Sequence, residues 1–253
     1  MNPMDSILIH PLSSAQAGLW YLGQAGYVIR SAGRTLAIDP YLTDSVAEVA
    51  PDCKRILPVP IEPEDLRVDV FIVTHDHLDH LDPQTILRYP AKDKTVFVAP
   101  HLACEKLRSL GVPQRNITCV DVGGRAALEG MDIEGIYALA TDKKASDTAG
   151  YVVRFANGRS VYHSSDTGFC ERLVEAPPRV EALLVCINGK WGNLSAAEAA
   201  KLAAAVRPRF AIPNHYDMMR PNMADPAVFA RLVKELDPSL DVRILRVMEP
   251  FVW

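Results

Sequence analysis

The sequence lacks paired cysteines, long apolar runs and an excess of basic residues. Its five cysteines are scattered, odd in number and never spaced as Cys-x-x-Cys, which favours reduced thiols and a cytoplasmic location. No window offers about 18 uncharged apolar residues, and the first ten residues contain no basic leader. The formal charge of −4 provides no basic surface for a phosphate backbone. We therefore expect neither nucleic acid nor a membrane as a partner.

What the chain does contain is enough apolar sequence for one large core. At 253 residues with 49% hydrophobic content, we expect a single domain over residues 1–253. Short β-branched and apolar runs predict strands at 6–9, 18–22, 26–30, 34–39, 68–73, 95–98, 117–120, 132–139, 151–155, 160–163, 181–186 and 210–212. Capping signals predict helices after Asp82, at residues 101–110, after Ser195 and after Asp225.

The order of these elements indicates the fold class. Two runs of strands with helices between them predict an α/β protein in which two sheets pack face to face with helices outside. Residues 40–63 contain five prolines and show no period, so we expect a long loop there, of the kind that forms a lid over a site.

The most informative segment is residues 74–80, which read Thr-His-Asp-His-Leu-Asp-His directly after the predicted buried strand 68–73. His75 and His77 are two residues apart and project to the same side of an extended chain, while the following turn brings Asp79 and His80 to a neighbouring point. Three imidazoles and a carboxylate placed in this way suit two adjacent metal ions.

Further ligands are expected directly after other buried strands, where loops gather at one end of a sheet. Asp166 follows strand 160–163 and is a candidate to bridge two ions, because a carboxylate does this more readily than an imidazole. His215 follows strand 210–212 and is a candidate for the second ion. For the first ion, Asp142 and Asp147 compete, and Asp142 could equally be a solvated residue beside two lysines.

Other polar residues near strand ends have supporting roles in this interpretation. Asp39 ends a predicted strand, and we expect its carboxylate to orient a metal-binding histidine; His163 is expected to be a packed or orienting imidazole. Four residues are candidates for substrate binding: Asn188, Lys190, Trp191 and Arg220. Lys190 and Arg220, together with Lys54, could hold an anionic group such as a sugar phosphate; the alternative is that each is an ordinary solvated charge.

These motifs resemble those of the metallo-β-lactamase superfamily of hydrolases. The matching segments are residues 74–80, Ser-Ser-Asp-Thr-Gly at 164–168 and Ile-Pro-Asn-His at 212–215. Within that superfamily the chain is most similar to the L-ascorbate-6-phosphate lactonase branch, through residues 20–26, 78–82, 162–166 and 215–217. The resemblance implies an αβ/βα sandwich of two mixed sheets with two divalent ions at one edge.

The resemblance also bears on the metal. Superfamily members usually carry histidine where this chain has Asp142, and an oxygen ligand shifts preference modestly from zinc towards manganese. Manganese is the metal that the lactonase branch is thought to use, so manganese and zinc are both candidates.

The expected activity is hydrolysis of a lactone or ester in a small polar or phosphorylated metabolite. Water between two divalent ions is acidified enough to supply hydroxide near neutral pH. We expect His75, His77 and Asp142 on the first ion, Asp79, His80 and His215 on the second, and Asp166 across both. Asp79 is also a candidate proton shuttle, and Tyr216 a candidate donor to the developing oxyanion.

Three other functions are compatible with the same motifs. A phosphodiesterase would use the same pair of ions, and a di-iron redox protein of the same fold would bind iron instead. A non-catalytic binding protein would keep the fold while leaving the ligand set idle. A small molecule is the expected partner, and assembly into a homo-oligomer is left open.

Overall fold

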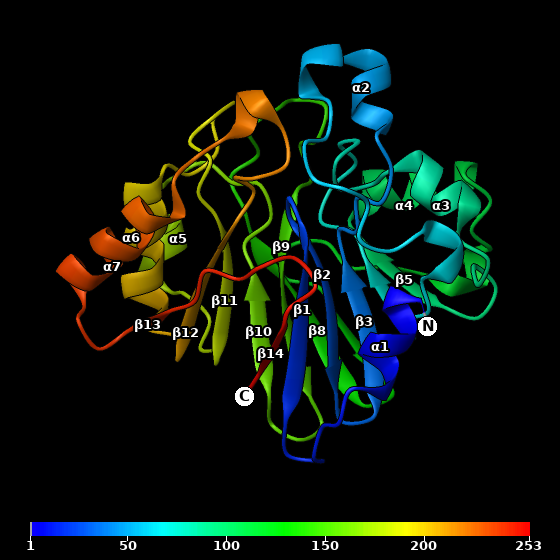
Figure 1. Cartoon of the computed structure of the whole chain (residues 1–253), viewed down its shortest axis with the longest axis horizontal. Helices are drawn as coiled ribbons and strands as arrows, with labels where there is room; N and C mark the ends of the chain where they lie inside the picture. Colours follow the sequence, from blue (N-terminus) through cyan, green and yellow to red (C-terminus); the bar gives the residue numbers. More distant parts are fainter. Residues whose placement is uncertain (1) are drawn as a thin grey trace.

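Two mixed sheets of seven strands each form the centre of the computed structural model, which describes residues 2–253 (Figure 1). The first sheet runs β14 (Pro250–Val252), β1 (Ala17–Gly23), β2 (Gly26–Ser31), β3 (Arg34–Ile38), β4 (Val70–Ile72), β5 (Val96–Ala99) and β6 (Ile117–Cys119). The second runs β13 (Asp241–Val242), β12 (Phe210–Asn214), β11 (Ala182–Cys186), β10 (Ser160–His163), β9 (Ala149–Phe155), β8 (Met131–Tyr137) and β7 (Arg125–Leu128). The predicted fold class is confirmed.

The main core lies between the two sheets. Strand residues alternate between the faces of a sheet, so Ile72 points into the inter-sheet core while its neighbour Phe71 packs outside, under the helices. Val153 and Leu184 of the second sheet meet the same inter-sheet core and are fully buried. Both faces of each sheet are therefore covered, which explains why these strands read as nearly continuous apolar runs.

Helices cover the outer faces of both sheets. They are α1 (Pro3–Ile9), α2 (Ser45–Val49), α3 (Pro83–Arg88), α4 (His101–Ser109), α5 (Arg172–Glu175), α6 (Ala196–Val206) and α7 (Pro226–Leu236), with 3₁₀ turns η1 (Pro51–Cys53), η2 (Pro63–Asp65), η3 (Gln114–Asn116) and η4 (Arg220–Asn222). Figure 1 shows α5, α6 and α7 on one side and α3 and α4 on the other. Within residues 2–253, no helix is long and apolar enough to cross a membrane.

Several local expectations differ from the structure. The predicted strand at 6–9 is wrong: these residues belong to α1, because Asn2 and Asp5 form a capping box around Pro3 at the first helical position. Residues 40–63 are not one irregular loop, since they contain α2, η1 and η2. Strands β7, β13 and β14 were not predicted, and two of them have only two or three residues.

Strand direction brings the motifs together. Strands β3 and β4 are parallel in the first sheet, as are β10, β11 and β12 in the second, so their carboxyl ends reach the same edge of the sandwich. Figure 1 shows α2 at the top of the view, beyond that edge. The residues that follow these strands, including the 74–80 motif, are thereby gathered at one place.

Candidate metal centre

The motif turn is held by the carboxylate of Asp39 at the end of β3. Oδ1 of Asp39 accepts a hydrogen bond from the backbone N–H of Thr74 (2.8 Å), and Oδ2 accepts one from the Thr74 hydroxyl (2.6 Å). Oδ2 also accepts from Nδ1 of His80 (2.7 Å), because a carboxylate can only accept. That bond leaves the lone pair on Nε2 of His80 free for a metal ion, as expected for Asp39.

His75 and His77 present lone pairs to each other. The single hydrogen of the Thr74 hydroxyl is given to Asp39, so Nδ1 of His75 donates to Thr74 Oγ1 (3.0 Å) and Nε2 carries the lone pair. Nε2 of His77 faces the Asp142 carboxylate at 3.4 Å, which leaves its lone pair on Nδ1. Nε2 of His75 and Nδ1 of His77 lie 2.9 Å apart. Two lone pairs at this distance favour a cation beside both.

Two groups of ligand atoms result. His75, His77 and Asp166 form one group, and Asp79, His80 and His215 form the other; within each group the ligand atoms lie within 4.8 Å of one another. Oδ1 of Asp166 also lies 3.1 Å from Nε2 of His215 and 3.4 Å from Nε2 of His80. Asp166 therefore lies close to both groups, and its role as a bridge between two ions stays a prediction.

The donor set fits divalent ions. Oδ1 of Asp166 is buried and accepts no hydrogen bond of acceptable geometry, although Oδ2 accepts one from Asn193 (2.7 Å). A buried carboxylate oxygen without a hydrogen-bond donor, close to the ring nitrogens of two histidines, is an arrangement that a cation satisfies. Imidazole and carboxylate groups suit zinc and, with more oxygen ligands, manganese.

The charges of the site are strongly coupled. Burial disfavours a charged His80, but the carboxylates of Asp166, Asp79 and Asp39 outweigh it and raise the pKa of His80 well above its usual value. Burial likewise opposes ionisation of Asp166, yet His215 and His80 hold its pKa well below the usual range. Without ions, these imidazoles and carboxylates attract one another as opposite charges.

Asp142 and Asp147 prove to be in different surroundings. Asp142 is exposed and contacts the edge of His77, but it does not join either group of converging ligand atoms. Asp147 is drawn away from the site, because its Oδ2 accepts a hydrogen bond from the backbone N–H of Leu102 in the first turn of α4 (2.6 Å). Asp142 thus orients His77 in this structure, and its role as a ligand stays a prediction.

Two further candidates lie near the site without facing it. His163 is buried, with Nε2 2.9 Å from the carbonyl oxygen of Ala25, and it packs beneath the metal groups as expected. Tyr216 stacks on Tyr21 with ring centroids 6.4 Å apart and does not line the pocket beside the metal groups. Its position gives no support to the predicted role as an oxyanion donor, because its side chain packs among apolar residues.

Gln24 is a site residue that the sequence reasoning missed. It lies in the turn between β1 and β2 with a φ of 55°, and its side chain is fully buried. Its Nε2 donates to Oδ2 of Asp79 (2.7 Å) and lies 3.2 Å from Nε2 of His215. Its backbone carbonyl accepts from the N–H of His215 (2.6 Å). The only sequence signal was a polar residue between two glycines in a tight turn.

Asn222 supports the same group from η4. Its Nδ2 lies 2.9 Å from Nδ1 of His215 and 3.3 Å from Oε1 of Gln24, and its Oδ1 accepts from Nδ2 of Asn188 (2.6 Å). Asn188 is therefore buried in this network and does not reach the pocket, in contrast to its predicted contact with substrate.

A pocket of about 330 Å³ opens beside the metal groups. Trp191 lines it, together with His77, Asp79, Asp166 and His215 from the metal groups. The predicted cationic contacts with substrate are not seen: Lys190 and Arg220 are exposed and are not among the lining residues. Lys190 lies at the start of the turn that carries Trp191. Lys54 lines another cavity.

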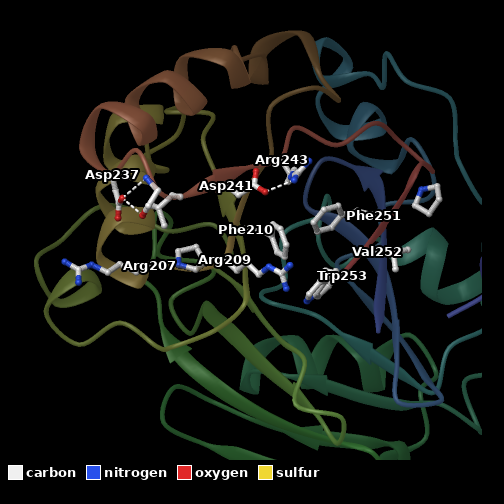
Figure 2. A pocket seen from close by; sticks show the side chains of 13 residues that line it. Arg207, Arg209, Phe210, Asp237, Asp241, Arg243, Phe251, Val252 and Trp253 are labelled. Atoms are coloured by element: carbon white, nitrogen blue, oxygen red, sulfur yellow. Dashed lines mark hydrogen bonds and ion pairs between the residues drawn. The ribbon is translucent and has the colours of Figure 1, made fainter. Parts of the chain in front are cut away.

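A larger cavity lies at the opposite end of β12. It measures about 970 Å³ and contains Arg207, Arg209 and Arg243 around the rings of Phe210 and Trp253, as Figure 2 shows. Among the residues described, neither group of metal-binding side chains touches it. The chemistry therefore belongs to the smaller pocket at the other end of the strand.

Comparison with known proteins gives the same assignment. The family model described as "Beta-lactamase superfamily domain" matches residues 25–216, which include all six converging metal-binding residues. The chain belongs to the metallo-β-lactamase superfamily. It is also 33% identical over 228 residues to a "UPF0173 metal-dependent hydrolase" of Thermofilum pendens, covering 86% of this chain and 91% of that protein. The protein is thus a member of a family of metal-dependent hydrolases.

Solved structures of other proteins share the fold. Igni18, described as a metallo hydrolase from Ignicoccus hospitalis, superposes with a TM-score of 0.76 at 21% identity, covering 94% of this chain and 98% of that one. The isothiocyanate hydrolase from Delia radicum gut bacteria gives a TM-score of 0.74 at 19% identity, covering 92% and 98%. At these identities the likeness shows the fold alone.

Proposed function

We propose that this metallo-β-lactamase superfamily member hydrolyses the ester or lactone bond of a small molecule with two divalent ions, manganese or zinc. The observation that carries the proposal is the position of Asp166, whose carboxylate belongs to one group of ligands and lies within 3.4 Å of two imidazoles of the other. A carboxylate shared in this way is suited to hold two ions side by side.

The residues of the chain orient the metal ligands and transfer the proton. When bound, divalent ions supply hydroxide near neutral pH and polarise a carbonyl oxygen. Asp166 is fixed by the amide of Asn193, and His80 by Asp39, so both keep their direction as substrate enters. Asp79 lines the pocket, and its lowered pKa suits a relay that passes a proton to the leaving oxygen and does not retain it.

The test combines metal content with turnover. Protein prepared without chelators is analysed for manganese and zinc, reloaded with each, and assayed on dihydrocoumarin, 4-nitrophenyl butyrate and bis(4-nitrophenyl) phosphate. We expect two ions per chain and hydrolysis of the lactone and the ester. Asp166→Asn should lose bound metal and turnover, whereas Asp132→Asn on the exposed face of β8 should keep both.

Two results would contradict the proposal. Turnover confined to the phosphodiester would point to the phosphodiesterase alternative. A fully metal-loaded protein that hydrolyses none of the three compounds would show that the ions have another role.

A further inference from the structure

Part of the lining of the pocket beside the metal groups is apolar, and we call this part the apolar wall. Four of its lining residues form this wall: Val46, Cys53, Trp191 and Met219. Within residues 2–253, no lysine or arginine lines the pocket. Its volume of about 330 Å³ lies at the lower end of the range for small-molecule sites. A substrate in this pocket therefore meets both ligand atoms and apolar surface.

Trp191 is displayed on a fixed turn. The turn closes through a hydrogen bond from the N–H of Asn193 to the carbonyl of Lys190 (2.9 Å), and Trp191 has a φ of 50°. A Cβ on Gly192 would meet the side chain of Thr141 at 3.3 Å, so this turn is packed closely against its neighbour. Yet 58% of Trp191 is exposed. Because Trp191 also lines the pocket beside the metal groups, its ring offers a flat apolar surface to a ligand there.

The other part of the wall comes from the segment above the edge. Val46 of α2 and Cys53 of η1 pack with Met219 in a small apolar cluster that includes Tyr41. The backbone N–H of Ile56 donates to the carbonyl of Met218 (2.9 Å) and ties this segment to the strand exit of the second sheet. The apolar wall is thus built into the fold.

Among the described residues, the pocket lining offers an anionic substrate no lysine or arginine as a partner. Lys190 and Arg220 are exposed and lie outside the pocket lining. Four carboxylates surround the ligand groups, which balances the four positive charges of two divalent ions: they belong to Asp39, Asp79, Asp142 and Asp166. The arginines that could attract an anion gather in the separate cavity of Figure 2.

We propose that the substrate is a small uncharged molecule whose flat aromatic or apolar group packs on Trp191 and whose hydrolysable carbonyl faces the metal-binding residues. This inference rests on the proposed hydrolase function. It replaces the phosphorylated metabolite expected from the sequence, because the described residues that line the pocket include no lysine or arginine to pair with a phosphate.

The kinetic test uses a pair of esters that differ in one distant charge. The metal-loaded protein should hydrolyse 4-nitrophenyl butyrate with a kcat/KM at least about tenfold above that for 4-nitrophenyl hemisuccinate, since an unpaired carboxylate is poorly accommodated against an apolar wall. Trp191→Ala should lower kcat/KM for dihydrocoumarin about tenfold, and Trp191→Phe should restore most of it. Leu236→Ala, which removes a similarly exposed apolar side chain on α7, should have no effect. Equal rates for the two esters would overturn the inference while leaving the hydrolase function intact.

A binding measurement separates the inference from turnover. The lactam 3,4-dihydroquinolin-2-one has the shape of the aromatic lactone and resists hydrolysis, so its affinity is measured by isothermal titration. We expect binding to the metal-loaded protein that Trp191→Ala weakens about tenfold and Trp191→Phe largely retains. Absence of binding, or binding unchanged in Trp191→Ala, would overturn the inference even if esters are hydrolysed. Binding without any ester turnover would support it and contradict the proposed function.

Discussion

Gln24 couples a backbone turn to the second group of ligands. Its amide donates to Asp79, its backbone carbonyl accepts from His215, and its side chain is fully buried. A hydrogen-bond donor outside the ligand set commonly fixes the ligand that it contacts, and its loss costs about 10- to 100-fold in metal affinity. Gln24 therefore acts through Asp79 and His215 as a positioning residue.

Replacing this amide should weaken one ion selectively. Gln24→Met keeps the length of the side chain and removes the hydrogen bond, so we expect the affinity for the ion held by Asp79, His80 and His215 to fall about tenfold. Competition with a coloured chelator measures this affinity. Gln114→Met, in the exposed turn η3, is the matched control and should bind both ions as the parent does. Equal affinities in Gln24→Met and the parent would exclude the positioning role.

The two groups of ligands should also lose their ions at different pH. Burial, aided by the charge of His80, lowers the pKa of His75. For His80 and His215, burial acts in the same direction, but Asp166 and Asp79 outweigh it and raise the pKa of each. A histidine must be neutral to bind a metal, so a raised pKa means that protons displace the ion at a higher pH.

We expect the two metal ions to be lost in two separate steps. As the pH is lowered from about 7.5 to about 5, the ion held by His80 and His215 should leave first, and the ion held with His75 should follow at lower pH. Elemental analysis of protein equilibrated along this series counts the ions per chain. A single concerted loss of both ions would contradict the assignment.

At the scale of elements, Arg55 fastens the segment that carries α2 and η1. Its guanidinium donates to the carbonyls of Tyr41 (2.6 Å) and Pro58 (3.2 Å) and lies 5.1 Å from the centre of the Tyr41 ring. Hydrogen bonds from a charged donor contribute about 1.5–3 kcal/mol. Arg55 therefore adds to the apolar cluster and to the Ile56–Met218 hydrogen bond in holding the segment over the site.

Removing this side chain should loosen the segment. We expect Arg55→Ala to speed hydrogen exchange of backbone amides in residues 41–57. Because the apolar wall loses its support, we also expect KM for dihydrocoumarin to rise about fivefold, with a smaller change in kcat. Arg231→Ala on the exposed face of α7 is the control. Unchanged exchange in residues 41–57 would show that the apolar cluster alone fixes the segment.

At the scale of the whole molecule, the metal groups join the two sheets. His75 and His80 follow β4 of the first sheet, whereas Asp166 and His215 follow β10 and β12 of the second. Only the folded chain brings these residues together to bind ions. Ion binding must therefore raise the free energy of unfolding. The carboxylates buried at this edge would otherwise have to be satisfied by imidazoles alone.

Metal removal should therefore lower the melting temperature. An ion at 100 times its Kd adds about 2.7 kcal/mol, which for a chain of this size corresponds to about 5–10 °C in Tm. Scanning calorimetry with and without chelator measures the shift. Asp166→Asn should show little dependence on added metal, and a parent protein with equal Tm in both conditions would contradict the linkage.

Much of the fold could be predicted from local sequence signals. The strand at 160–163 and the helix after Ser195 lie where the pattern indicated, because an apolar run and a capping box act over a few residues. The same kind of signal was overlooked at Asn2 and Asp5, and the expected strand there is a helix. Very short strands such as β13 escaped prediction, since two residues carry no period.

The sequence by itself determined the ligand types and their spacing in residues 74–80, because those positions are close along the chain. Only the tertiary structure decided which distant residues share the site. His80 and His215 are separated by 135 positions, and Gln24 and Asn222 by 198, and no local pattern records such contacts. The same holds for the position of Lys190 and Arg220 outside the pocket lining, because strand order and direction, which arise from packing two sheets on one core, determine what each loop faces.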